Sequence, residues 1–322
     1  MLYALINGYE NFKLSSMKEL FTMAQVNQAD DGNTESTLHE VIETKIASGD
    51  KVKIFVHAWV PRDAQRILLC VQGLGGHGGY YENLAHQLTS EGTIVVAPDL
   101  RGHGRSGGAR GDIDRFERYL VDLDAAYTWA STMWPETPVF VMGESMGVSI
   151  ATQFVANRRY PTSQNPLAGL VFVSPVLSSA IRPTLGEMIH FIRLLFIAPK
   201  RPSIAITGRE EFGSRDSAFN ELLRDDPLFV RLVSARFLIR LTLWFRQSER
   251  QAHKVSMPLL VLVGGRDYVA RRSGTTAFLR HVSASDQHIV NFPQAYHSLF
   301  HDPDTPDVVR VLASWLGTHG GI

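Results

Sequence analysis

The feature of this sequence that most constrains its fold is a series of short apolar runs that alternate with longer segments of helical periodicity. Within each run, hydrophobic residues stand at consecutive positions rather than at every second one. Such runs are typical of parallel strands that are buried between two layers of helices. The runs are Ile67–Val71, Thr93–Ala97, Val139–Met142, Leu170–Val173, Leu259–Val263 and, more weakly, Gln287–Phe292.

Helical patterns occupy the segments between these runs. Alternating strands and helices build a parallel sheet through right-handed crossovers, so the sequence predicts an α/β fold with a mostly parallel central sheet flanked by helices. Before this pattern begins, Val41–Ile46 and Lys51–Val56 flank Ser48-Gly49-Asp50, which indicates a hairpin. The predicted helices are Tyr80–Thr89, Phe116–Met133, Met146–Asn157, Ser273–His281 and Asp307–Leu316.

The alternation is interrupted between Val173 and Leu259, where the chain has helical periodicity and no convincing strand. We predict that this insertion is a helical cap over the carboxyl ends of the strands, where ligands bind to such sheets. A separate helical domain fits less well, because the strand pattern resumes afterwards. The predicted organisation is an N-terminal extension and linker at 1–36, a catalytic core at 37–177 and 254–322, and the cap at 178–253.

Composition excludes several classes of protein. Of the 322 residues, Lys and Arg together number 32, as do Asp and Glu, so the formal net charge is zero and no nucleic-acid partner is expected. The one cysteine, Cys70, lies in an apolar run, which favours a buried, unreactive thiol. We identify no signal peptide and no transmembrane segment, and we expect a cytoplasmic protein.

The segment Gly143-Glu144-Ser145-Met146-Gly147 matches the motif G-x-S-x-G. It follows a predicted strand and precedes a predicted helix, which is the context that this motif requires, because the serine must stand on a sharp strand-to-helix turn. Glycines allow such a turn to pack closely against its neighbours. We therefore predict that Ser145 is a catalytic nucleophile.

A serine hydroxyl needs a base, and the base needs an orienting carboxylate. Asp267 directly follows the strand Leu259–Val263, and His297 lies in a loop before the last helix, which gives the chain order serine, acid, histidine. We predict a catalytic triad of Ser145, Asp267 and His297. The rivals are placed less well, and they are Asp286, Asp302, His288 and His301.

Charge on the reacting carbonyl oxygen must be met by backbone N–H groups. We predict that one donor is the N–H of Met146, and that the other is the N–H of Leu74 in the glycine-rich loop Gln72–Gly79. A phosphate-binding loop is a weaker interpretation, since no Lys-Ser/Thr pair ends the glycine run.

These motifs resemble the monoacylglycerol lipase and lysophospholipase branch of the α/β hydrolases. The resemblance extends from about Leu38 to Leu316. It implies that the turn Asp99–Ser106 is structural. This chain has Gln72 where the family usually has a histidine thought to brace the oxyanion loop. Because an amide can still donate and accept hydrogen bonds, we expect the loop to be kept. The matching segments are Gln72–His77, Asp99–Ser106, Gly143–Gly147, Ala295–His297, Ser214–Asp216 and Asp225–Leu228.

The predicted cap has two apolar stripes, and each stripe can be interpreted in two ways. One stripe runs along Leu185–Ile197 and includes Ile189 and Ile192, and the other runs along Phe229–Phe245 and includes Phe237 and Trp244. The stripes either pack against the core or line an acyl-binding tunnel and touch a membrane surface. On the second interpretation, these four residues contact the substrate.

The resulting prediction is a serine hydrolase that cleaves a single-chain lipid ester, such as a monoacylglycerol or a lysophospholipid, through an acyl-enzyme. This chemistry needs no metal and no organic cofactor. Thioesterases and peptidases share the triad and stay open as alternatives. A non-catalytic receptor for a small hydrophobic ligand is the alternative from another class. The sequence leaves the oligomeric state open.

Overall fold

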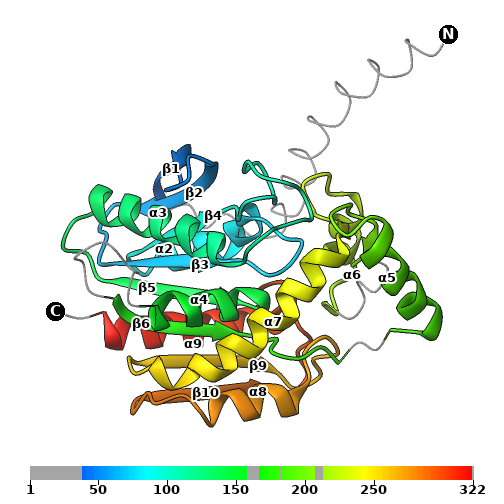
Figure 1. Cartoon of the computed structure of the whole chain (residues 1–322). Helices are drawn as coiled ribbons and strands as arrows, with labels where there is room; N and C mark the ends of the chain where they lie inside the picture. Colours follow the sequence, from blue (N-terminus) through cyan, green and yellow to red (C-terminus); the bar gives the residue numbers. More distant parts are fainter. Residues whose placement is uncertain (1–37, 158–166, 181–182, 207–212, 321–322) are drawn as a thin grey trace. The chain divides into compact units, whose positions relative to one another are not determined.

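The computed structural model describes residues 38–157, 167–180, 183–206 and 213–320. The predicted extension and linker at 1–36 lies outside these ranges. The central element of the described part of the chain is an eight-stranded sheet with the strand order β1-β2-β4-β3-β5-β6-β9-β10 (Figure 1). The strands are β1 (Leu38–Ala47), β2 (Lys53–Pro61), β3 (Arg66–Val71), β4 (Thr93–Pro98), β5 (Val139–Glu144), β6 (Leu167–Val173), β9 (Leu259–Gly264) and β10 (Gln287–Phe292).

The sheet confirms the predicted α/β architecture. β1 and β2 form the predicted antiparallel hairpin, and β2 pairs antiparallel with β4. All the other neighbours pair in parallel. The consecutive apolar residues of the inner strands β3 and β4 are buried on both faces of the sheet, which is why these strands lack an alternating pattern. β10, at the edge of the sheet, is largely accessible.

Two hydrophobic clusters cover the two faces of the sheet. On β3, Ile67 and Leu69 belong to one cluster and Leu68 and Cys70 belong to the other. The first cluster packs under α3 (Glu117–Met133), α4 (Met146–Ala156), α7 (Ala235–Gln251) and α8 (Arg272–Leu279). The second packs under α2 (Glu82–Thr89) and α9 (Thr305–His319). Cys70 is fully buried, and burial raises the pKa of its thiol well above the usual value, as expected.

The insertion predicted as a cap, for which we keep that name, follows β6 and contains α5 (Leu185–Ile197), α6 (Ser217–Asp225) and α7. No strand was predicted here, but β7 (Ile204–Ala205) and β8 (Leu232–Val233) form a short antiparallel pair. The helix expected from Phe229 instead begins at Ala235. Ser234 caps it by accepting a hydrogen bond from the Phe237 N–H at 2.9 Å, and the residues before Ser234 pair with β7.

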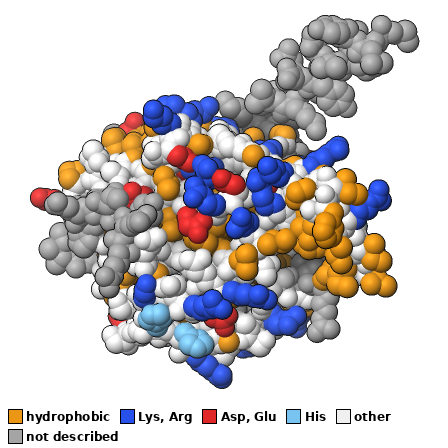
Figure 2. Space-filling view, viewed as in Figure 1, with side chains coloured by type: hydrophobic (Ala, Val, Ile, Leu, Met, Phe, Trp, Pro, Cys, Tyr) orange, Lys and Arg blue, Asp and Glu red, His pale blue; other side chains and the backbone are white. Residues whose placement is uncertain are grey.

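α5 presents an apolar surface to solvent. It begins with a capping box formed by Thr184 and Glu187, and none of its side chains is buried. Hydrophobic side chains gather at the cap end of the face shown in Figure 2. No helix among the described residues is both long enough and apolar enough to span a lipid bilayer.

Candidate active site

Ser145 stands on the turn between β5 and α4, with φ 55° and ψ −114°. This left-handed backbone is strained for a residue with a side chain, and it lifts the hydroxyl out of the strand. The flanking glycines allow the turn to pack: a Cβ on Gly147 would lie 2.1 Å from the Val71 carbonyl oxygen, and one on Gly143 would lie 2.6 Å from the Gly147 oxygen. The motif is thus folded as the sequence predicts.

The three predicted triad side chains meet at the carboxyl ends of β5, β9 and β10. His297 Nε2 lies 2.9 Å from Ser145 Oγ, and His297 Nδ1 lies 2.7 Å from Asp267 Oδ2. Asp267 is fixed in turn, because its Oδ1 accepts the backbone N–H groups of Val269 at 2.8 Å and Ala270 at 2.9 Å. A hydroxyl, an imidazole and a carboxylate are therefore in hydrogen-bond contact, which is the arrangement that a catalytic triad requires.

The charges of this site suit proton transfer. Burial disfavours the imidazolium of His297, but the Asp267 carboxylate outweighs burial and raises the pKa of His297 above its usual value. Burial likewise disfavours the Asp267 carboxylate, and His297 outweighs that effect and lowers the pKa of Asp267. The buried carboxyl of Glu144, which accepts the Tyr81 hydroxyl at 2.8 Å, has a pKa raised by its burial.

The rival residues are engaged elsewhere. The ring of His301 stacks on that of Phe219 at 3.9 Å between centroids, and burial lowers the pKa of His301 to about 4. His288 pairs with Asp286 at 3.1 Å on the exposed side of β10. Asp302 binds the Arg215 guanidinium. Within the part of the chain that the structure describes, none of these side chains is hydrogen-bonded to Ser145.

The glycine-rich loop lies against the nucleophile. A Cβ on Gly73 would lie 3.1 Å from Ser145 Cβ, so this loop approaches the serine as closely as a glycine allows. Gln72 is buried, and its Nε2 donates to the Gly76 carbonyl at 2.7 Å, so the amide joins the two ends of this glycine-rich segment. Within the described ranges, the Leu74 N–H has no backbone acceptor. Met146 is the first residue of α4, and the first N–H groups of a helix have no acceptor within the helix, so its N–H is available to an oxyanion.

The Asp99–Ser106 turn is structural, as the resemblance implies. The buried Asp99 carboxylate accepts the N–H groups of Gly78 and Arg105, each at 2.7 Å. His103 is buried, its Nδ1 lies 3.1 Å from the Arg101 oxygen, and burial lowers its pKa to about 4.

The four cap residues predicted to contact substrate fall into two groups. Phe237 and Trp244 are 1% and 3% exposed and pack on Phe116, with ring centroids 5.2 and 5.7 Å from it. Walls of an open tunnel would be accessible to solvent, so this burial favours the core-packing interpretation for these two residues. Ile189 and Ile192 instead face solvent on α5, at 59% and 53% exposure.

One group of side chains has the composition of a metal site. His57, His77 and Asp99 place one potential ligand atom each within 4.8 Å of the others. The Nδ1 lone pair of His77, however, already accepts the Gly79 N–H at 3.1 Å, while its Nε2 lies 2.9 Å from Asp226 Oδ2. The group is therefore assembled as a hydrogen-bond network, which leaves His77 no lone pair for a metal ion.

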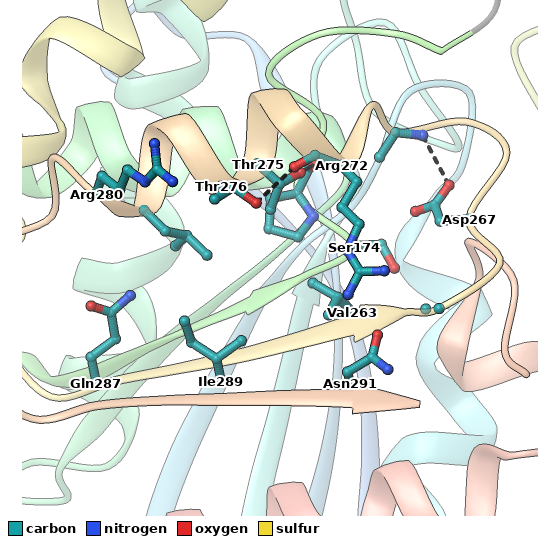
Figure 3. A pocket seen from close by; sticks show the side chains of 15 residues that line it. Ser174, Val263, Asp267, Arg272, Thr275, Thr276, Arg280, Gln287, Ile289 and Asn291 are labelled. Carbon is teal, nitrogen blue, oxygen red and sulfur yellow. Dashed lines mark hydrogen bonds between the residues drawn. The ribbon is translucent and has the colours of Figure 1, made fainter. Parts of the chain in front are cut away.

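A cavity of about 350 Å³ lies between α8 and β10 (Figure 3). Asp267 lines it, but Ser145 and His297 do not. It therefore lies behind the acid of the triad rather than at the nucleophile.

The sequence analysis did not identify two residues that fix the loops around this site, Ser174 and Asp226. The Ser174 hydroxyl donates to the His297 carbonyl at 2.6 Å and fixes the loop of the base. Asp226 in the cap binds His77 and Tyr80 beside the oxyanion loop. The Asp225–Leu228 segment had been noted as family-like, which was the signal available for Asp226, whereas nothing local to Ser174 indicated its role.

Comparison with known proteins assigns the chain to a family. The family described as "Serine aminopeptidase, S33" matches residues 62–304, which is more than half of the chain and includes all three triad positions. The chain belongs to this family. The family match agrees with the α/β-hydrolase fold and with the resemblance stated from the motifs.

Within the family, the chain is similar to proteins named as lipases. It is 28% identical to a monoacylglycerol lipase of Mycolicibacterium smegmatis over 86% of this chain and 97% of that protein. It is 26% identical to the monoglyceride lipase of Mus musculus, over 84% of this chain and 89% of that protein. Among solved structures, the monoacylglycerol lipase of Paleococcus ferrophilus shares the fold with a TM-score of 0.69 at 23% identity, covering 87% of this chain and 100% of that chain.

Proposed function

We propose that this protein is a serine hydrolase that cleaves a carboxylic ester of a single-chain lipid, of the monoacylglycerol or lysophospholipid type. The observation that carries this proposal is the hydrogen-bonded series Ser145–His297–Asp267, with 2.9 Å and 2.7 Å between the bonded atoms. The names of the relatives, monoacylglycerol lipase and monoglyceride lipase, support the substrate class.

The reaction follows from the positions of these atoms. Ser145 Oγ attacks the ester carbonyl while His297 Nε2 takes its proton, and the Asp267 carboxylate stabilises the resulting imidazolium. The N–H groups of Leu74 and Met146 bind the negative oxygen of the tetrahedral intermediate. His297 then gives the proton to the leaving alcohol, which leaves an acyl-enzyme on Ser145. Water, activated by the same imidazole, releases the carboxylic acid and restores the serine.

A membrane surface is the proposed source of the substrate. On α5, Ile189, Ile192 and Phe196 are 59%, 53% and 85% exposed, and the cations Lys200 and Arg201 follow the helix. An apolar helix face flanked by cations suits the boundary of a lipid layer. We therefore place peripheral membrane contact at α5 rather than at Phe237 or Trp244.

The test is a panel of esters from acetate to palmitate, with monoacylglycerol, lysophosphatidylcholine and a peptide amide alongside. We expect hydrolysis of the lipid esters, covalent labelling of the protein by a fluorophosphonate, and loss of both in Ser145→Ala. A folded protein that is neither labelled nor active would favour the receptor function. Faster cleavage of the peptide amide than of any ester would favour a peptidase.

A further inference from the structure

Among the described residues of the cap, the short segment Asp226–Val230, which follows α6, contacts the oxyanion loop (residues 72–79). The Val230 N–H donates to the Gly75 carbonyl at 2.9 Å. The Phe229 ring lies over Gly75, where a Cβ would come within 2.6 Å of the ring. Gly75 has φ +90°, a left-handed conformation that favours glycine. The cap therefore contacts the loop at the residue next to Leu74.

Asp226 makes a second contact with the same region. Its carboxylate is 7% exposed, and Oδ2 accepts hydrogen bonds from the Tyr80 hydroxyl and from His77 Nε2, the latter at 2.9 Å. Because His77 Nδ1 accepts the Gly79 N–H at 3.1 Å, the proton of the neutral ring must sit on Nε2. The cap carboxylate thus selects the tautomer of His77 that lets this ring cap η1 (Gly78–Tyr81).

The segment that carries Asp226 is itself held in place. Asp226 Oδ1 accepts the Leu228 N–H at 2.7 Å, and Arg231 Nη1 donates to the Asp226 carbonyl, also at 2.7 Å. From the core, Arg110 donates to the Pro227 carbonyl at 3.1 Å. Burial disfavours the Asp226 carboxylate, yet the donors His77 and Tyr80 outweigh burial and lower its pKa. The acceptor is therefore charged and fixed.

We propose that Asp226 is a positioning residue of the reaction: through His77 and Tyr80 it fixes the loop that carries the Leu74 N–H, so that the oxyanion hole is complete only while this segment of the cap is docked. The inference rests on the proposed function of the site. An oxyanion-hole donor acts only at the correct distance from the developing charge, and displacement by about 1 Å removes much of its effect.

The experiment compares Asp226→Ala and Asp226→Asn with Asp112→Ala on p-nitrophenyl acetate. Asp112 is a matched control, since its carboxylate binds the cap residues Ser234 and Arg236 but no residue of the oxyanion loop. We expect Asp226→Ala to lower kcat about 10- to 100-fold, with KM changed less than about twofold. Asp226→Asn should recover part of kcat, because its amide oxygen still accepts from His77. Asp112→Ala should keep kcat.

A second readout separates positioning from a general loss of structure. A trifluoromethyl ketone adds to Ser145 and places a negative oxygen in the oxyanion hole, whereas the neutral alcohol 1-decanol binds without one. In Asp226→Ala, the Kd of the ketone should rise in proportion to the fall in kcat/KM, and the Kd of 1-decanol should stay unchanged. Equal weakening of both ligands, or an unchanged kcat and ketone affinity, would overturn the proposal.

Two further measurements distinguish a failure of this inference from misfolding of the variant and from a failure of the proposed function. If Asp226→Ala does not fold, Tyr80→Phe removes only the hydroxyl donor and should lower kcat less than Asp226→Asn but in the same direction. An unchanged kcat in both of these variants would also overturn the proposal. If the unaltered protein cleaves no ester, the proposed function fails, while the ketone affinities still report whether Asp226 positions the loop.

Discussion

The pairing of His297 with Asp267 predicts how activity depends on pH. The carboxylate raises the pKa of His297 above the ordinary value of 6.5, and only the neutral imidazole accepts the Ser145 proton. Values of kcat/KM should therefore fall as the pH drops through this raised pKa, with a midpoint above pH 6.5. A pH–rate profile of acetate ester hydrolysis measures the midpoint. A midpoint at or below the ordinary value would contradict the pairing.

Asp267→Asn should move this midpoint and reduce the rate. The amide would place its NH₂ group against His297 Nδ1, which would force the proton onto Nε2 and block acceptance from Ser145. We expect kcat to fall about 10³- to 10⁴-fold, as misplacement of the tautomer does in other serine hydrolases. The residual activity should show a lower midpoint, since burial without the carboxylate lowers the pKa of His297. An unchanged midpoint would mean that Asp267 does not control the base.

Local sequence predicted that Ser145, Asp267 and His297 would lie together, because each follows a predicted strand, and their side chains are in hydrogen-bond contact. Parallel strands bring their carboxyl ends to one edge of the sheet, so the meeting of the three required no knowledge of the cap. Asp226 could not be assigned in this way. Its contact with His77 depends on how the cap docks, and no local periodicity encodes that docking.

At the scale of single elements, α5 and α7 show why two apolar stripes of similar composition have different roles. On α7, Phe237 and Trp244 are buried against Phe116, whereas α5 has no buried side chain. A hydrophobic stripe indicates a helix but not the surface that the helix covers. The apolar stripe extends back to Phe229, but α7 begins only at Ala235. The residues before it form β8 and the helix cap Ser234, which the apolar pattern alone does not indicate.

The exposed face of α5 predicts a loss of activity that depends on the form of the substrate. Ile189→Ser combined with Ile192→Ser should lower the rate on monoacylglycerol in vesicles several-fold, because α5 would lose apolar area for the lipid boundary. Hydrolysis of dissolved acetate ester should be unchanged, and so should stability, within about 0.5 kcal/mol.

The control for this variant is Met133→Ser, which removes a 47% exposed apolar side chain from α3, outside the cap. It should leave both rates unchanged. Vesicle co-sedimentation of the three proteins measures binding directly. Equal losses on the dissolved and vesicle substrates would show that α5 acts on the site rather than at a lipid surface.

At the scale of the whole described domain, cap and core share one hydrophobic cluster. Phe237 and Trp244 from the cap and Phe116 from the core all belong to the cluster under α3 and α4. Removing a side chain from a shared cluster destabilises both parts. We therefore expect residues 38–320 to unfold in a single transition, although the core surrounds the cap in the sequence.

Phe237→Ala tests this cooperativity. It should lower the free energy of unfolding by about 3 to 5 kcal/mol through lost burial and a new cavity. Urea unfolding followed by tryptophan fluorescence and by circular dichroism should give coincident curves for the variant. Ile239→Ala, at a 39% exposed position on α7, should be nearly neutral. A separate early transition in Phe237→Ala would contradict cooperative unfolding, whereas a loss of activity confined to long-chain esters would favour the tunnel interpretation.

The complete burial of Cys70 has a practical consequence for studies of motion. Cys70 is the one cysteine of the 322 residues, and it is 0% exposed on strand β3 of the sheet. Thiol-reactive dyes should therefore leave the folded protein unmodified. A cysteine placed at the exposed position of Phe196 on α5 would accept a fluorophore at a single site. Movement of the cap could then be followed by spectroscopy in the otherwise native chain.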